Sequence, residues 1–123
     1  MTGTILMIDD DPILLEMYEA VLSSTYTVLL AENVKKAIDL LSSQDVDAVG
    51  CDLHVGVDKG IEVLDWIGLN KPALMKKSVL ISGDMLTCLS DLEVPVLIKP
   101  VQISKLQETF DQLLDGRELN YEI

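Results

Sequence analysis

The sequence has little positive charge. It contains nine Lys and Arg residues against 21 Asp and Glu residues, and its formal net charge at pH 7 is −12. A protein with this charge repels phosphate backbones and acidic lipid surfaces, so direct binding to nucleic acid is disfavoured. It also lacks an apolar run near the roughly 20 residues that cross a bilayer, and we therefore expect no membrane insertion.

Cysteine is scarce as well. The two cysteines, Cys51 and Cys88, do not have the spacing of a metal site. The opening segment MTGTILMIDDDP carries charge too early for a signal peptide, so we expect a protein of the reducing cytoplasm. A chain of 123 residues is long enough for one core and too short for a two-domain enzyme, and residues 1–123 are therefore expected to form one domain.

Five short apolar runs that are rich in β-branched residues predict strands. They are Thr4 to Ile8, Tyr26 to Ala31, Ala48 to Cys51, Ser78 to Ile81, and Val94 to Ile98. Runs that are apolar on both faces are typical of parallel strands buried between two layers of helices.

Apolar residues at helical spacing lie between and after these runs. The four stripes are Leu14, Tyr18, Val21 and Leu22; Val34, Ala37, Ile38 and Leu41; Ile61, Leu64 and Ile67; and Ile103, Leu106, Phe110 and Leu113. The alternation predicts an α/β fold with a doubly wound, five-stranded parallel sheet that is flanked by helices. The segment from Asp84 to Ser90 has room for one short helix.

Polar residues stand at the carboxyl ends of four predicted strands, where sheets of this type bind ligands. Asp9 and Asp10 follow the first strand, Asp52 the third, Ser82 the fourth and Lys99 the fifth. Close carboxylates repel one another unless a cation joins them, and Mg²⁺ prefers such oxygen ligands. A carboxylate beside a metal, a hydroxyl and a lysine is suited to accept a phosphoryl group as an aspartyl phosphate.

Four motifs in order resemble the receiver domain of two-component response regulators, over essentially the whole chain. They are ILMIDDDP, DAVGCDLHV, VLISGD and VPVLIKP. The intervals agree with that family, with 42 residues from Asp10 to Asp52 and 30 from Asp52 to Ser82. Gly60 matches the glycine that opens the third helix in the family. The resemblance implies a flavodoxin-like receiver fold with the strand order 2-1-3-4-5.

The resemblance also implies a metal site. Asp10 and Asp52 are implied to bind Mg²⁺ with their side chains, and the backbone carbonyl of His54 is implied to be a third ligand. Asp9 is implied to contact the ion through a bound water.

In the same family pattern Asp52 is the phosphoacceptor, Ser82 donates to one phosphoryl oxygen and Lys99 pairs with another. The peptide bond between Lys99 and Pro100 is implied to be cis. The implied phosphodonor is a histidine kinase or a histidine phosphotransfer protein, and the signal passes to a downstream protein by contact. Such a protein is a phosphoacceptor that assists its own phosphorylation and dephosphorylation, and it is not an enzyme.

The sequence departs from the family pattern at three places. Val55 and Gly56 replace the usual Met and Pro, which predicts a mobile loop. Val96 replaces an aromatic residue that many members carry, and the interval from Ser82 to Lys99 is short, at 17 residues.

Two other functional classes remain open. A phosphatase of the haloacid-dehalogenase type also uses a strand-end Asp, Mg²⁺, a hydroxyl and a Lys. It needs an acid two residues after the nucleophile, where this chain has His54. The other class is a receiver-like interaction module that is not phosphorylated. The departures from the family pattern at Val96 and after Ser82 favour this class.

Overall fold

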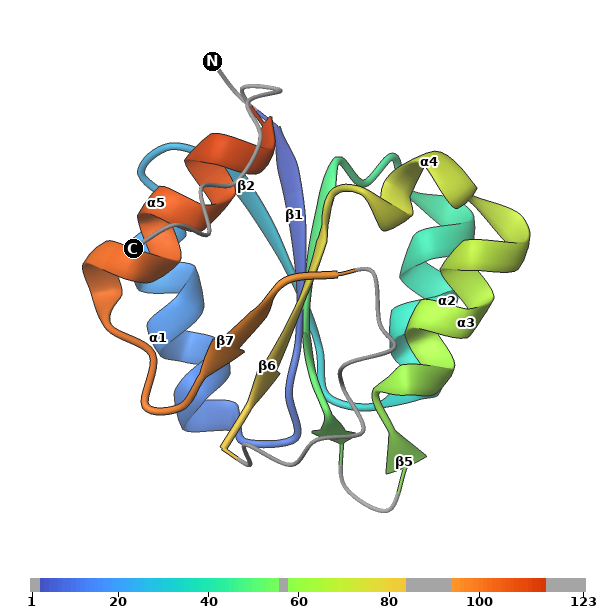
Figure 1. The fold of residues 1–123 in the computed structure, drawn as a ribbon, viewed down its shortest axis with the longest axis horizontal. Helices are drawn as coiled ribbons and strands as arrows, with labels where there is room; N and C mark the ends of the chain where they lie inside the picture. The colour runs from blue at the N-terminus through green and yellow to red at the C-terminus, as the bar shows by residue number, and fades with distance from the viewer. Residues whose placement is uncertain (1–2, 56–57, 84–93, 115–123) are drawn as a thin grey trace.

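The computed structural model describes residues 3–55, 58–83 and 94–114 (Figure 1). Five parallel strands form the main sheet: β1 (Thr4–Ile8), β2 (Thr27–Ala31), β3 (Ala48–Asp52), β6 (Ser78–Ser82) and β7 (Val96–Ile98). Their order in the sheet is β2-β1-β3-β6-β7. Counted along the chain within this sheet, the order is 2-1-3-4-5, which confirms the predicted doubly wound receiver fold.

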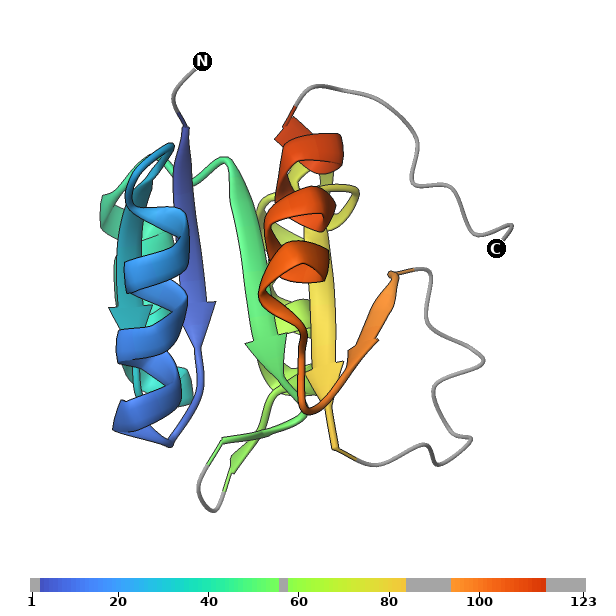
Figure 2. The same cartoon turned by 90° about the vertical axis from the view of Figure 1, so that its left-hand side faces the viewer.

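Helices cover both faces of the sheet (Figures 1 and 2). They are α1 (Pro12–Leu22), α2 (Val34–Ser43), α3 (Ile61–Asn70), α4 (Pro72–Met75) and α5 (Ile103–Leu114). Helices α1 and α5 lie on one face, and α2, α3 and α4 lie on the other. Within the described residues, no helix is long and apolar enough to span a bilayer.

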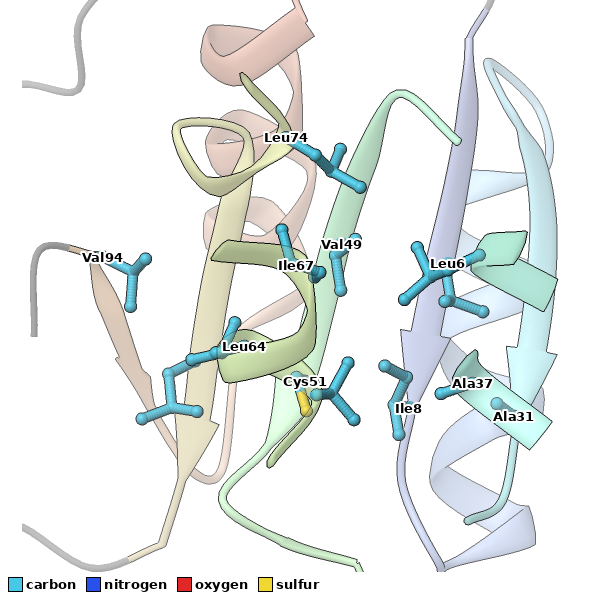
Figure 3. Packing of buried hydrophobic residues seen from close by; sticks show 13 residues of the cluster. Leu6, Ile8, Ala31, Ala37, Val49, Cys51, Leu64, Ile67, Leu74 and Val94 are labelled. Carbon is cyan, nitrogen blue, oxygen red and sulfur yellow. The ribbon is translucent and has the colours of Figure 1, made fainter. Parts of the chain in front are cut away.

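The pleat of the central strands divides the core into two clusters. Ile5 and Met7 of β1 pack with α1 and α5. Leu6 and Ile8 of the same strand pack with α2 and α3 on the other face (Figure 3). Successive side chains of a strand point to opposite faces, so a strand buried on both sides must be apolar throughout. This is why the continuous apolar runs of the sequence predicted the strands well.

Gly50 of β3 shows how closely the layer of α5 approaches the sheet. A Cβ atom on Gly50 would lie 2.8 Å from the Sδ atom of Met7 and 3.0 Å from the Cζ atom of Phe110. The absence of a side chain at this position therefore makes room for the buried ring of Phe110.

The predicted stripes were right in position except at Ile103. Leu14 is half-buried and packs against the cluster that contains Leu15, whereas Ile103, the first residue of α5, is 57% exposed. Three short elements were not predicted, namely α4 and the strands β4 (His54–Val55) and β5 (Asp58–Lys59), which pair as a two-stranded antiparallel sheet. The short helix expected from Asp84 to Ser90 lies outside the described residues.

Candidate functional site

The carboxyl ends of four neighbouring strands bring together the polar residues that the sequence singled out. Asp9 follows β1, Asp52 ends β3, Ser82 ends β6 and Lys99 follows β7. The register explains the proximity, since β1, β3, β6 and β7 are adjacent in the sheet and end at the same edge. The backbone amide of Lys99 also donates to the carbonyl of Ser82 at 2.8 Å, so this pairing continues past the end of β7.

Three carboxylates form the acidic part of the site. Oxygen atoms of Asp9, Asp10 and Asp52 all lie within 4.8 Å of one another. Asp9 and Asp52 are buried, and Asp10 is exposed. The cluster therefore combines two carboxylates with restricted access to water and one that faces solvent, which is an oxygen-rich donor set that suits a hard divalent cation.

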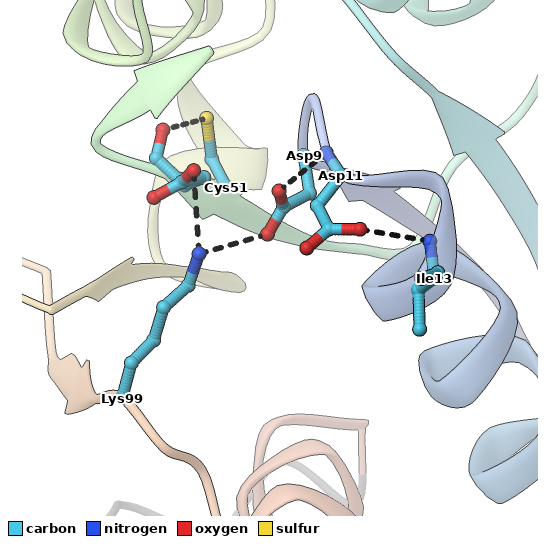
Figure 4. A network of polar contacts seen from close by, with 6 residues as sticks. Asp9, Asp11, Ile13, Cys51 and Lys99 are labelled. Atoms are coloured by element: carbon cyan, nitrogen blue, oxygen red, sulfur yellow. Dashed lines mark hydrogen bonds and ion pairs between the residues drawn. The ribbon is translucent and has the colours of Figure 1, made fainter.

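Lys99 bridges the two buried carboxylates (Figure 4). Its Nζ atom lies 3.0 Å from Oδ2 of Asp9 and 3.4 Å from Oδ2 of Asp52. Burial alone lowers the pKa of Lys99, but the hydrogen bond to Asp9 and the charges of Asp52 and Asp9 outweigh it, so the pKa is raised. Lys99 is thus a permanent cation at neutral pH, and it neutralises one of the three negative charges.

The local structure after β1 holds Asp9 in place. The backbone amide of Asp11 donates to Oδ1 of Asp9 at 2.9 Å, while Asp11 itself accepts from the amide of Ile13 as the N-cap of α1 (Figure 4). Pro12 stands at the start of the helix. Proline is favoured at this position because the N–H group that it lacks would have no partner within the helix. The capped start of α1 thus holds the segment that carries Asp9 in place.

Tyr18 lies close to the site, although its place on an apolar stripe of the sequence predicted only a core residue. Its side chain is 1% exposed, and together with Lys99 it lines a cavity of about 320 Å³. Burial raises the pKa of Tyr18, and the negative charges of Asp9 and Asp52 raise it further, so the hydroxyl keeps its proton and remains a donor.

Strand alternation is the signal that points to Tyr18. Met7, Gly50 and Leu97 face α1 and α5, and each lies two residues before Asp9, Asp52 or Lys99 respectively. Because side chains two residues apart on a strand share a face, Asp9, Asp52 and Lys99 point toward the layer that contains α1. A hydroxyl on the inner stripe of α1 is therefore close to them.

The backbone on the other side of Asp52 is packed very closely. A Cβ atom on Gly60, at the start of α3, would lie 1.8 Å from the carbonyl oxygen of Asp52. The thiol of Cys51 donates to that same carbonyl at 3.3 Å and lies 3.5 Å from the carbonyl of Gly60. Burial raises the pKa of Cys51, and the charges of Asp52 and Asp9 add to the effect, so this thiol stays protonated and is a packing residue.

The remaining predicted residues flank this centre. Ser82 is 1% exposed at the end of β6, and the peptide bond between Lys99 and Pro100 is cis, as the family resemblance implied. His54 begins β4 two residues after Asp52, and its backbone pairs with Lys59 in the small antiparallel sheet. Of the two residues for which a mobile loop was predicted, Val55 is the second residue of the short strand β4, and Gly56 lies outside the described residues.

A comparison with protein families finds one that spans most of the chain. The model of the response regulator receiver domain matches residues 5–111. No curated protein matches the chain at a significant level.

Solved structures with the same fold are numerous. The signal receiver domain of an HD domain-containing protein from Pseudomonas fluorescens Pf-5 has a TM-score of 0.84 at 25% identity, covering 94% of this chain and 97% of that one. The response regulator TrrA from Thermotoga maritima, in complex with Mg²⁺ and BeF, has a TM-score of 0.80 at 26% identity, covering 91% and 99%. A CheY-like receiver domain protein from Methanospirillum hungatei JF-1 reaches 0.85 at 20% identity, covering 94% and 96%.

Proposed function

The chain belongs to the response regulator receiver domain family, and on that premise we propose that it is a signalling protein that accepts a phosphoryl group on Asp52. The observation that carries the proposal is the bridge of Lys99 between Asp9 and Asp52 at the carboxyl edge of the sheet. Asp52 has a fixed cation on one side and further carboxylates on the other. The cation suits the negative charge of a phosphoryl group, and the carboxylates suit a metal ion.

Asp52 is the nucleophile in this proposal. One of its carboxylate oxygens forms a bond to the phosphorus of the donor, while the bond between phosphorus and a histidine nitrogen of the donor breaks. The electron pair of the broken bond remains on that nitrogen, which takes up a proton from solvent. The acyl phosphate is later hydrolysed, when an oxygen of water bonds to phosphorus and the carboxylate of Asp52 leaves.

Mg²⁺ is the proposed cofactor, held by the side chains of Asp10 and Asp52 and by the backbone carbonyl of His54, with Asp9 close by. Three carboxylates with a single compensating lysine leave an excess of negative charge, and this excess fits a divalent cation. When bound, the ion supplies charge that offsets the phosphoryl oxygens during transfer. Asp10 is exposed, so the cluster is open to solvent on its side.

Lys99 and Ser82 complete the proposed machinery. Lys99 already lies 3.4 Å from Asp52, and its ammonium group is placed to pair with an oxygen of a phosphoryl group there. Ser82 ends the strand next to β3, and its hydroxyl is proposed to donate to a second phosphoryl oxygen.

The proposed phosphodonor is a histidine kinase or a histidine phosphotransfer protein, and the downstream partner is a protein that recognises the phosphorylated form. We propose that residues 1–123 act as a single receiver domain in the cytoplasm, without binding nucleic acid directly and without inserting into a membrane. Its chemistry is limited to assisting its own phosphorylation and dephosphorylation, which makes it a signalling module and not an enzyme.

Incubation with acetyl phosphate, followed by intact mass measurement, tests the proposal. The wild type should gain the mass of one phosphoryl group in Mg²⁺ and gain none in EDTA. Asp52→Asn should gain none in either buffer.

The matched control is Asp47→Asn. Asp47 precedes β3 at the opposite end of the same strand, where its carboxylate accepts from the amide of Thr4 at 2.8 Å. An amide oxygen can still accept that bond, so Asp47→Asn should be phosphorylated like the wild type. Phosphorylation of Asp52→Asn to the wild-type level would refute the assignment.

A further inference from the structure

Asp11 forms hydrogen bonds with its amide, its carbonyl and its side chain. The amide donates to Oδ1 of Asp9 at 2.9 Å, and Oδ1 of Asp11 accepts from the amide of Ile13 at 2.9 Å (Figure 4). The carbonyl oxygen of Asp11 accepts from the amide of Leu15 at 3.1 Å, in the first turn of α1. The residue that caps the helix is therefore also the residue that contacts the buried Asp9.

The cap fixes the direction in which the amide of Asp11 points. Asp11 has extended dihedral angles, φ −92° and ψ 109°, and in this conformation its carboxylate turns back to the amide of Ile13. The first amides of a helix have no partner within the helix, so the amide of Ile13 loses its acceptor if the side chain is removed. The first turn then loosens, and the N–H group that points at Asp9 loses its fixed orientation.

Asp9 has both carboxylate oxygens engaged. Oδ1 accepts from the amide of Asp11, and Oδ2 accepts from Nζ of Lys99 at 3.0 Å. Asp9 is 1% exposed, so water is a poor replacement for a lost donor. A carboxylate that loses the donor to one oxygen can turn about its last side-chain bond, and turning moves the oxygen that Lys99 contacts.

Lys99 passes this effect on to the proposed phosphoacceptor. Its ammonium group lies 3.0 Å from Oδ2 of Asp9 and 3.4 Å from Oδ2 of Asp52, so the position of Asp9 helps to set where the cation stands beside Asp52. Asp11 itself is exposed, and within the described residues it does not belong to the carboxylate cluster that could hold a metal. A contribution of Asp11 to phosphoryl transfer therefore acts through its hydrogen bonds.

From this geometry we propose that Asp11 is a positioning residue for phosphoryl transfer. By capping α1, its side chain directs its own amide to Asp9, and Asp9 in turn holds Lys99 beside the phosphoacceptor. The inference rests on the proposed phosphorylation of Asp52. It assigns a role to an aspartate that neither binds the metal nor accepts the phosphoryl group.

Asp11→Ala removes the cap and keeps the backbone amide. At saturating Mg²⁺ and acetyl phosphate, the first-order rate of phosphorylation, followed by intact mass, should fall roughly threefold to tenfold, as expected for one hydrogen bond. Asp11→Asn removes the negative charge and keeps an oxygen that can accept from the amide of Ile13. Asparagine caps helices about as well as aspartate, so this variant should stay within about twofold of the wild-type rate.

Asn33→Ala is the matched control for the loss of a cap. Asn33 is the N-cap of α2, where its side-chain oxygen accepts from the amide of Lys36 at 2.8 Å. Its removal should lower stability in urea by an amount similar to Asp11→Ala. Helix α2 lies on the face of the sheet opposite α1, so the rate of phosphorylation should stay at the wild-type value.

The Lys99→Ala background shows whether the effect passes through Lys99, with sampling over hours so that slow variants remain measurable. Here there is no ammonium group to position, so adding Asp11→Ala should not lower the rate further. The role of Asp11 would be overturned by equal rates for Asp11→Ala and Asn33→Ala, or by the same loss with and without Lys99. A loss in Asp11→Asn as large as in Asp11→Ala would also overturn it, because the charge and not the cap would then be responsible. If the wild type itself gains no phosphoryl group, the proposed function fails first, and the inference fails with it.

Discussion

Gly60→Ala is expected to destabilise the protein through a single contact with the backbone of Asp52. The dihedral angles of Gly60, φ −58° and ψ −25°, are ordinary for any residue, so the substitution causes no backbone strain by itself. The new Cβ atom would lie 1.8 Å from the carbonyl oxygen of Asp52 and 2.9 Å from its carbonyl carbon. Atoms at these distances overlap, and the start of α3 must therefore move away from the end of β3.

That movement is opposed from both sides. The amide of Gly60 donates to the carbonyl of Leu53 at 2.7 Å, and Asp52 is paired with Ile81 of β6. Overpacking of a tight site costs about 1–3 kcal/mol, and since the contacted atom is backbone we expect a loss near 3 kcal/mol in the free energy of unfolding. The displacement also shifts Asp52, so the rate of phosphorylation should fall together with stability.

Urea denaturation measures the first effect, with Gly68→Ala as the matched control in the same helix. Gly68 is exposed, and a Cβ atom there would meet the Cε atom of Met75 at 3.3 Å, which is the flexible end of a side chain. Alanine is the better helix former by about 0.5–1 kcal/mol, so Gly68→Ala should stabilise the protein or leave it unchanged. If Gly60→Ala is as stable as Gly68→Ala, the close approach of α3 to Asp52 is wrong.

Three other perturbations address the metal, the charge cluster and a helix cap. Mg²⁺ at about ten times its dissociation constant should raise the free energy of unfolding by about 1.4 kcal/mol, and a melting temperature that is the same in Mg²⁺ and in EDTA would contradict this. In EDTA, Asp52→Asn should melt above the wild type, because one of three clustered carboxylates is gone; a clear decrease would show that the bond to Lys99 outweighs the repulsion. Asn33→Ala removes the side-chain oxygen that accepts from the amide of Lys36 at 2.8 Å, and it should cost about 1 kcal/mol in urea denaturation while the phosphorylation rate stays unchanged.

The strands and the edge that carries the site could be predicted because both follow from short-range patterns. Parallel strands buried on two faces leave continuous apolar runs, and parallel strands also end at a common edge. The proximity of Asp9, Asp52 and Lys99 therefore follows from sequence order once the strand order is known. That order came from the resemblance to a family and not from the residues alone.

Other features depend on three-dimensional detail that the sequence does not show. Tyr18 is close enough to Asp9 and Asp52 for their charges to raise its pKa because of the way α1 packs on the sheet, and the apolar stripe alone predicted a core residue. The two residues each of β4 and β5 are too few for a periodic pattern. Ile103 fits the stripe of α5 and is nevertheless exposed, which the spacing of apolar residues could not reveal.

Direct location of the phosphoryl group is the measurement that tests the central claim. After incubation with acetyl phosphate and Mg²⁺, treatment with borohydride reduces an aspartyl phosphate to the corresponding alcohol, and peptide mass spectrometry then identifies the reduced residue. The account predicts homoserine at position 52 and unmodified aspartate at positions 9 and 10. Reduction at position 9 or 10, or phosphorylated protein in which position 52 is never reduced, would contradict it.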